Sequence, residues 1–167
     1  KASDAEDFQN WAVSHIGEKI PNNNEILKPR FTRFENAFNK MFPNKRFKEI
    51  RTKDGYRDVI FEEYGKETSI ENLSSGEKQI VYRGCFVLSR QLSKDEHLLI
   101  IDEPEISLHP DWQFKIVPFY RDLFTDAQGN QNAQIFLATH SPFIIHNAVD
   151  EQVVVLTREQ SSGKVKV

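Results

Sequence analysis

The sequence predicts an α/β protein with a parallel sheet and flanking helices, preceded by two helices and a β-hairpin. From about residue 72 onward, apolar runs that suit strands alternate with segments of helical periodicity. Strand, helix, strand, helix and strand in this order favour parallel strands joined by right-handed crossovers. Before residue 72, the dipeptide Asp54-Gly55 separates two strand-like segments, as in a hairpin.

Two helices and the hairpin are expected within residues 1–70. A first helix can begin at Ser3 or Asp4 and end near Ile20, before a proline and three asparagines. A second helix is expected over 29–41, where apolar residues recur at spacings of three and four and favour a core-facing stripe. The hairpin strands are expected over 47–52 and 56–62.

The alternating elements are expected within residues 71–167. Because Leu98 to Ile101 are continuously apolar, we expect that strand to be covered on both faces. Pro118 is expected to kink the helix in which it stands. Helices are expected over 75–92 and 110–123 and from residue 142, strands over 98–101, 134–138 and 153–156, and a last hairpin through 161–163.

Composition narrows the class of protein. The chain has 167 residues, 38% hydrophobic and 28% charged, which suits one folded globular domain and excludes disorder. The net charge of −3 gives no overall attraction to nucleic acid or anionic membranes. Cys85 is the single cysteine and excludes an internal disulfide, so a cytoplasmic location is expected. No apolar run has the roughly 18 residues of a membrane span, so no membrane partner is expected.

A serine-rich segment opens the helix expected over 75–92. Ser74 at the N-cap and Glu77 three residues later match a capping box, which is the plain structural interpretation. A functional interpretation adds to it, because a helix N-terminus has unpaired N–H groups and a partial positive charge. Gly76 would let a ligand approach the backbone, so this segment also suits phosphate binding.

Two carboxylates follow the apolar strand at 98–101. Asp102 and Glu103 stand at its carboxyl end, where ligands of open α/β sheets bind. Asp102 would suit Mg²⁺, and Glu103 would suit the polarisation of an attacking water as a general base. The alternative is that both are loop acids that cap the next element.

A histidine follows the next expected strand, over 134–138. Strand alignment would bring His140 to the same sheet edge as Glu103, where a neutral imidazole can donate a hydrogen bond to a phosphate oxygen. A lone histidine more often has a capping or core role. The functional interpretation gains weight because the three motifs occur in one order, each at a helix start or strand end.

Together these motifs resemble the ABC-ATPase superfamily of P-loop NTPases. Leu73 to Gln79 resembles its signature motif, Leu98 to Glu103 its Walker B strand, Ser107 to Pro110 its D-loop, and His140 its switch histidine. Within the superfamily, the chain looks most like the soluble bacterial group with OLD-family, Septu and retron-associated defence ATPases and RecF-like proteins. The resemblance is strong over about 71–157, and the preceding segment fits this group only loosely.

The resemblance implies an ATP hydrolase that works with Mg²⁺ as a head-to-tail homodimer or higher homo-oligomer. Each ATP would lie between one subunit's P-loop and the other's signature motif. Glu103 and His140 would be catalytic, Asp102 would hold the metal, and Ser107 and His109 would lie at the D-loop interface. The residues implied to contact nucleotide are Ser74, Ser75, Gly76 and Glu77. For His109 with Pro110, a plain helix start is an equal alternative.

One motif of the superfamily is missing from these 167 residues. Gly65-Lys66 is followed by Glu67, and Gly163-Lys164 by Val165, so no Gly-x-x-x-x-Gly-Lys-Ser/Thr loop is present. The chain begins with Lys1 instead of Met, and we expect the loop to precede it. The chain would then be the C-terminal part of an ATPase domain and inactive alone, with a naturally truncated protein as the alternative.

Two functions from different classes remain open. The leading hypothesis is nucleotide-gated dimerisation that controls a DNA- or defence-related effector, such as a nuclease, with nucleic acid as a further partner. The second hypothesis is an assembly module that does not hydrolyse ATP, which the absent P-loop motivates.

Overall fold

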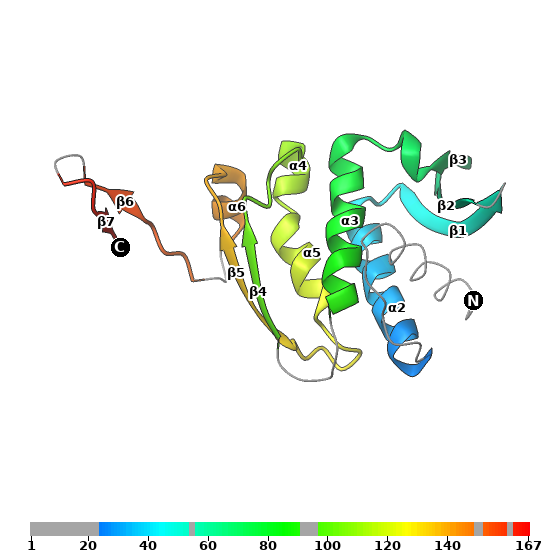
Figure 1. Ribbon diagram of the computed structural model, residues 1–167, viewed down its shortest axis with the longest axis horizontal. Helices are drawn as coiled ribbons and strands as arrows, with labels where there is room; N and C mark the ends of the chain where they lie inside the picture. The colour runs from blue at the N-terminus through cyan, green and yellow to red at the C-terminus, as the bar shows by residue number, and fades with distance from the viewer. Residues whose placement is uncertain (1–23, 54–55, 91–96, 149–151, 160–161) are drawn as a thin grey trace.

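The computed structural model describes residues 24–53, 56–90, 97–148, 152–159 and 162–167. The helix expected to end near Ile20, the Asp54-Gly55 dipeptide and part of the last hairpin lie outside the described residues. In the first half of the described chain, a long helix precedes a three-stranded antiparallel sheet (Figure 1). These elements are α2 (Asn24–Met41), β1 (Lys45–Lys53), β2 (Tyr56–Glu63) and β3 (Lys66–Ser69).

The expected hairpin is confirmed, and a third strand extends it. β1 and β2 pair antiparallel from Lys45 opposite Glu63 to Lys53 opposite Tyr56. β3, which the sequence analysis missed, pairs with β2 through a turn at Tyr64 and Gly65. Both turn residues have positive φ, 49° and 75°, which matches the twist of a tight hairpin. A tyrosine in that conformation is unusual, so the sequence carries little signal for this turn.

The second half of the chain builds a parallel pair of strands and four α-helices. β4 and β5 pair in parallel from His97 opposite Ala133 to Asp102 opposite Ala138, as the α/β prediction requires. The elements are η1 (Ile70–Asn72), α3 (Ser75–Arg90), β4 (His97–Asp102), α4 (Pro110–Gln113), α5 (Ile116–Leu123), β5 (Ala133–Ala138), α6 (Pro142–Asn147), β6 (Thr157–Arg158) and β7 (Val165–Lys166).

The helix expected over 110–123 is broken into α4 and α5 because of Pro118. Pro118 has no N–H to donate to the carbonyl of Phe114, four residues earlier. The side-chain amide of Asn147, at the end of α6, donates to this carbonyl instead. The break therefore lies at Phe114 and Lys115, four and three residues before the proline, and the freed Phe114 carbonyl anchors α6.

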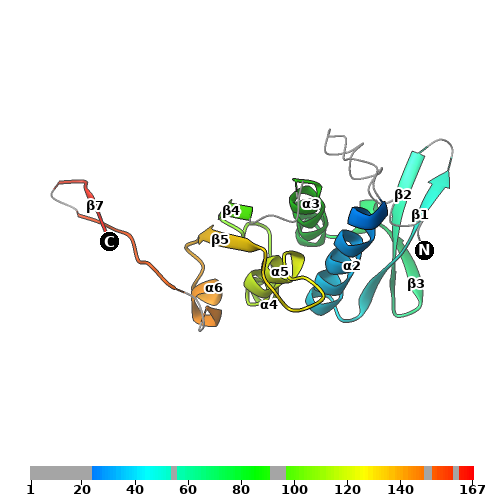
Figure 2. The ribbon, with the colours of Figure 1, turned by 90° about the horizontal axis from the view of Figure 1, so that it is seen from below.

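Helices α2, α3 and α5 lie between the two sheets (Figure 1 and Figure 2). Their apolar stripes form one cluster of buried residues with the inner face of the antiparallel sheet, which buries Val59 and Phe61. The largest buried helix residues are Phe34, Phe38, Met41, Ile80, Ile116, Phe119, Tyr120 and Leu123. Within the described residues, no helix combines the length and apolar character needed to cross a bilayer.

The β4–β5 sheet is covered on one face only, so the expectation of two covered faces was wrong for the described structure. Leu99 and Ile101 pack against the core, whereas Leu98, Ile100 and Phe136 on the opposite face are exposed. We call these three exposed side chains the bare face. A parallel sheet normally has both faces covered, so this face is where a further element would pack.

The third strand expected over 153–156 is also absent from the sheet. Val153 to Leu156 have no regular secondary structure and are exposed. They belong to an extended tail that leads away from the body to a small hairpin of β6 and β7 (Figure 1). The last hairpin is thus confirmed, but the apolar run before it has no strand partner among the described residues.

Candidate functional site

The signature-like segment forms the N-terminus of α3 as a capping box. The Ser74 hydroxyl donates to Glu77 Oε2 at 2.7 Å and accepts from the Glu77 N–H at 3.3 Å. The Ser74 N–H also donates to Glu77 Oε2, at 2.8 Å. Ser74 and Ser75 remain exposed. The plain structural interpretation is therefore confirmed, and it leaves both serines open to a ligand.

A buried lysine holds this helix start from the antiparallel sheet. Lys45, the first residue of β1, donates to Glu77 Oε1 and lies 3.3 Å from Glu63 Oε2. Burial opposes ionisation of Glu77, but the hydrogen bonds from Lys45 and Ser74 outweigh it, so the pKa of this carboxyl lies below its usual value. The capping carboxylate is thus ionised and fixed between two elements.

Gly76 packs directly against the loop that follows β4. A Cβ at this position would lie 2.5 Å from the Ser107 carbonyl oxygen and 2.8 Å from Cζ3 of Trp112. No side chain fits at that distance, so glycine is required by close approach. The signature-like segment and the D-loop-like segment are therefore in contact.

The two predicted carboxylates stand at the carboxyl end of β4. Asp102 is the last strand residue and is exposed. The Glu103 N–H continues the parallel ladder by donating to Ala138 O at 2.8 Å, and Glu103 then turns the chain with a φ of 45°. A left-handed residue at a strand end redirects its side chain, and such strain is frequent at functional sites.

Pro104 and Glu105 form a buried corner after Glu103. The Arg83 guanidinium of α3 donates to the Pro104 carbonyl at 2.7 Å. Glu105 Oε1 accepts from the Thr139 hydroxyl at 2.7 Å and from the His140 N–H at 3.0 Å. The corner therefore joins α3 to the loop after β5.

His140 lies at the same sheet edge as Glu103, as strand alignment predicted. Its Nδ1 is 3.4 Å from Glu103 Oε1 and 3.3 Å from Glu105 Oε1, and its side chain is 75% exposed. Next to it, Ser141 caps α6, with its hydroxyl 2.5 Å from Gln113 Oε1. The imidazole is thus anchored on one side and open on the other.

The expected D-loop residues lie at the surface before α4. Ser107 is exposed and has a φ of 66°, and His109 is exposed and caps α4 by accepting the Asp111 N–H at Nδ1, at 3.3 Å. The helix-start interpretation of His109 is thus confirmed. An interface role for these two residues remains a prediction.

The predicted residues divide into two groups in the described part of the chain. Glu103 and His140 come together at the edge of the parallel strands, and Gly76 meets Ser107 beside the start of α3. Between described residues, no hydrogen bond or ion pair joins the serines of the capping box to Glu103 or His140. The site therefore consists of two separate groups of residues, one at the start of α3 and one at the carboxyl edge of β4 and β5.

The donor set fits one kind of magnesium site. Among the described residues, no cluster of three or more His, Cys, Asp or Glu side chains could hold a metal. Mg²⁺ in nucleotide enzymes is held by one or two carboxylates together with phosphate oxygens and water. The exposed Asp102 at the strand edge suits this shared type of coordination and not a closed protein cage.

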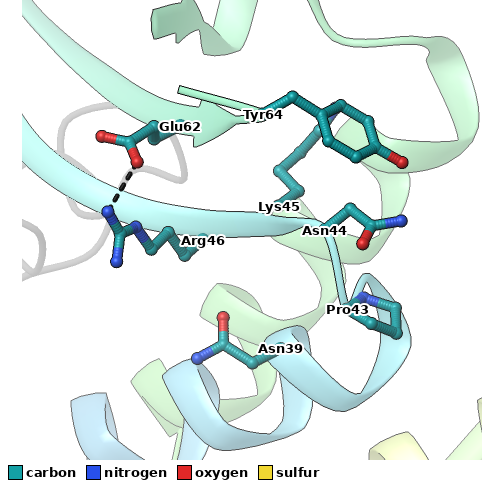
Figure 3. A pocket seen from close by; sticks show the side chains of 7 residues that line it. All are labelled: Asn39, Pro43, Asn44, Lys45, Arg46, Glu62 and Tyr64. Atoms are coloured by element: carbon teal, nitrogen blue, oxygen red, sulfur yellow. Dashed lines mark hydrogen bonds and ion pairs between the residues drawn. The ribbon is translucent and has the colours of Figure 1, made fainter. Parts of the chain in front are cut away.

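A pocket of about 270 Å³ lies elsewhere, where α2 meets the antiparallel sheet (Figure 3). Arg46 crosses its edge to Glu62, 2.5 Å away, and the lining is largely polar. It does not include any predicted site residue. The candidate chemistry is thus at the open strand edge and not in this pocket.

Sequence reasoning missed two residues of the site. Glu105 was given no role, although its carboxylate accepts a hydrogen bond from the His140 N–H. Lys45 was not considered, although it holds Glu77. Neither has a local signal, because each partner lies more than 30 positions away in the chain.

Comparison with curated proteins finds a Septu protein and two retron ATPases of bacteria as relatives. The chain is 26% identical to the Septu protein PtuA of Bacillus thuringiensis, over 90% of the chain and 39% of PtuA. It is 32% identical to the retron Vc95 probable ATPase of Vibrio cholerae serotype O1 biovar El Tor, over 59% of the chain and 20% of that protein. The retron Ec83 probable ATPase of Escherichia coli is 24% identical over 93% of the chain. The chain thus spans well under half the length of these relatives.

A solved structure and a family model also match this chain. A solved structure from work on ATP-driven dimerization and DNA-stimulated activation of SMC ATPases aligns with a TM-score of 0.60, at 15% identity, over 83% of each chain. The fold is therefore that of an SMC-type ATPase head. The AAA ATPase domain family matches residues 3–145. The chain accordingly belongs to the AAA ATPase domain family.

Proposed function

We propose that this chain supplies the signature, Walker B and switch segments of an ABC-type ATP hydrolase. The observation that carries the proposal is the meeting of Glu103 and His140, 3.4 Å apart, at the carboxyl edge of β4 and β5. A carboxylate and an imidazole side by side can orient a water and contact a phosphate. Family membership makes ATP the substrate we expect.

The strand-edge group would serve the subunit's own nucleotide. Glu103 orients the attacking water, and His140 contacts the γ-phosphate that hydrolysis removes. Asp102 would hold Mg²⁺, which neutralises charge on the phosphates when bound. The exposed Asp102 and His140 and the partly exposed Glu103 lie at one edge, which supports these roles.

The helix-start group would serve a nucleotide bound by a partner subunit. Ser74 and Ser75 are exposed at the N-terminus of α3, where the helix dipole and free N–H groups favour phosphate. Gly76 lies beneath them, against Ser107. The separation of these serines from Glu103 supports a head-to-tail arrangement, in which ATP holds two subunits together and hydrolysis releases them.

The remaining part of the machinery lies outside these 167 residues in our proposal. They contain no P-loop, and the relatives are more than twice as long as the matched region. We propose that the P-loop segment packs on the bare face formed by Leu98, Ile100 and Phe136. Ser107 and His109 would pass the state of one nucleotide site to the other, and the contact of Gly76 with Ser107 supports this coupling.

The test is ATP hydrolysis with Mg²⁺ by the full-length gene product and by the 167-residue chain. We expect turnover only in the full-length protein. Glu103→Gln should keep ATP binding and reduce turnover by at least about 100-fold, because the general base is removed and the shape is kept. Glu159→Gln is the control, since this acid bonds to Lys164 and Lys166 in the β6–β7 hairpin and, within the described chain, not to any residue of the proposed site. Unchanged hydrolysis by Glu103→Gln would exclude Glu103 as the base.

An assembly module without hydrolysis is the second candidate. The absent P-loop and the bare apolar face both favour a chain that completes a larger complex. If neither form hydrolyses ATP while the full-length protein still assembles with its partners, this candidate replaces the first. For the effector, the defence systems of the relatives favour a nuclease or another nucleic-acid enzyme.

A further inference from the structure

Glu105 is a buried carboxylate at the strand edge with no role in the scheme above. Its side chain is only 7% exposed. It lies in the turn after Glu103, where the Ile106 N–H donates to Glu103 O at 3.3 Å and the Leu108 N–H donates to Glu105 O at 2.9 Å. The backbone on both sides of Glu105 is therefore fixed, and its carboxylate has little freedom.

One oxygen of Glu105 collects the donors of the loop after β5. Oε1 accepts from the Thr139 hydroxyl at 2.7 Å and from the His140 N–H at 3.0 Å, and it lies 3.3 Å from His140 Nδ1. The Ser141 N–H donates in turn to the Thr139 hydroxyl at 3.0 Å. The backbone and the ring of His140 thus share one anchor point.

The carboxylate is held in its ionised, accepting form. Burial opposes ionisation, but the hydrogen bonds from Thr139 and from the His140 N–H outweigh it, and the pKa of Glu105 lies below its usual value. The second oxygen, Oε2, is buried and has no hydrogen-bond donor among the described residues. All the donors that the described chain offers therefore meet at Oε1.

This geometry selects one tautomer of His140. A carboxylate only accepts hydrogen bonds, so the imidazole nitrogen that faces it carries the proton. Nδ1 lies 3.3 Å from Glu105 Oε1 and 3.4 Å from Glu103 Oε1, so both carboxylates favour a proton on this nitrogen. Nε2 is left as the nitrogen that a ligand can reach. In the neutral ring Nε2 accepts, so the expected hydrogen bond to a phosphate oxygen requires the doubly protonated ring.

We propose that Glu105 is a positioning residue for His140: it keeps Nδ1 protonated and leaves Nε2 on the open side of the ring, so that Nε2 donates to a phosphate oxygen once it also takes up a proton. It also holds the ring 3.4 Å from Glu103, whose side chain is 46% exposed. The part about phosphate rests on the proposed ATP hydrolysis. The part about the tautomer does not, so it can be tested in this chain without nucleotide.

The test is ¹⁵N NMR of the imidazole rings in the histidine-labelled 167-residue chain, at a pH about two units above the ordinary histidine value of about 6.5. His140→Gln identifies the signals of His140. We expect His140 to show a protonated Nδ1 and an unprotonated Nε2. His109 is an internal reference with the opposite tautomer, because its Nδ1 accepts the Asp111 N–H. A predominantly Nε2-protonated His140 in the wild-type chain overturns the proposal.

Two variants separate the hydrogen bond from packing. Glu105→Gln keeps an oxygen where Thr139 and the His140 N–H point, so we expect the Nδ1–H form to remain. Glu105→Leu fills similar space without an acceptor, and we expect the ring to move to the Nε2–H form that free histidine favours in water. Asp111→Asn, which changes the exposed acid beside His109, should leave His140 unchanged. An Nδ1–H form that persists in folded Glu105→Leu overturns the proposal.

Hydrolysis by the full-length protein tests the phosphate half separately. Glu105→Leu should lower kcat by about tenfold or more and change KM little, since loss of a partner that orients a functional histidine has costs of this size. Glu105→Gln should restore most of the rate. Equal rates in wild type and Glu105→Leu overturn this half. If no form hydrolyses ATP, the proposed function fails, and the NMR result still decides the tautomer.

Discussion

Two residues other than glycine hold a left-handed backbone in the loop after β4. Glu103 has a φ of 45° and Ser107 a φ of 66°. This conformation costs a residue with a Cβ roughly 1–2 kcal/mol, so surrounding contacts must maintain it. The Glu103 N–H bonds to Ala138 O, and Arg83 holds the Pro104 carbonyl. These bonds fix the backbone on both sides of Glu103.

A methyl group at Gly76 tests the contact between the helix start and this loop. Gly76→Ala would place a Cβ 2.5 Å from Ser107 O, so either the helix or the loop must move. We expect a loss of about 1–3 kcal/mol in the free energy of unfolding, as in other overpacked sites. Urea denaturation measures it, with Ser75→Ala on the exposed side of the same turn as control. Equal stability of the two variants would mean that the contact is loose.

At the scale of elements, Lys45 joins the antiparallel sheet to α3. Its ammonium lies between Glu63 of β2 and Glu77 of the capping box. The pair is buried at the lysine end, where the side chain is 6% exposed. Lys45 therefore ties the first turn of α3 directly to β1 and β2.

Removal of this ammonium should be costly. Lys45→Met leaves the Glu77 carboxylate partly buried without its cation, and loss of one partner of a buried ion pair costs about 3 kcal/mol or more. Urea denaturation checks the loss against Lys48→Met on the same strand, whose exposed lysine pairs with Glu67 and should matter little. Similar losses in both variants would contradict a special role for Lys45.

Acid should remove a small contribution of the exposed Glu67 to the stability of the antiparallel sheet in a defined range of pH. Hydrogen bonds from Arg51 and Lys48 lower the pKa of Glu67 from 4.5 to about 2. Because the folded-state pKa is depressed, the stability that Glu67 adds is complete above pH 4.5 and is lost as the pH falls toward 2. The difference in unfolding midpoint between wild type and Glu67→Gln should therefore shrink over this range. A difference independent of pH would show that charge is not its source.

At the scale of the whole molecule, helices α2, α3 and α5 lie between the β1–β3 sheet and the β4–β5 sheet (Figure 1 and Figure 2). The antiparallel sheet buries one face against the helices, and the parallel strands do the same from the other side (Figure 2). The parallel strands then leave Leu98, Ile100 and Phe136 exposed. An apolar sheet face of this kind marks a surface for another element.

A charge at either of two adjacent residues of β4 should change the stability of the chain by very different amounts. Ile100 is 72% exposed on the bare face, so Ile100→Lys should change the free energy of unfolding by less than about 0.5 kcal/mol. Ile101 packs against the core, so Ile101→Lys should cost about 2 kcal/mol or more. Urea denaturation of both variants tests this. A large loss in Ile100→Lys would mean that the bare face is covered in solution.

Local patterns determined the elements and much of the site. The capping box of Ser74 and Glu77 forms within three residues, and the strand ends that carry Glu103 and His140 follow from apolar runs and parallel alignment. These features depend on neighbours in the chain, which a sequence displays. The β2–β3 turn was not predicted from the sequence, because Tyr64 adopts a conformation that its residue type rarely takes.

Tertiary structure alone decided the burial and partners of the charged groups. Glu105 meets the Thr139 hydroxyl 34 positions away, and Lys45 meets Glu77 32 positions away. The sequence also predicted strands over 98–101 and 153–156. It did not predict that the first strand would have one exposed apolar face, or that the second segment would pair with no strand of the described chain. Residue type and periodicity specify what a segment can bury, whereas the packing of distant segments determines what it meets. The sequence by itself therefore determined the motifs and their order, and only the folded chain decided how they are held.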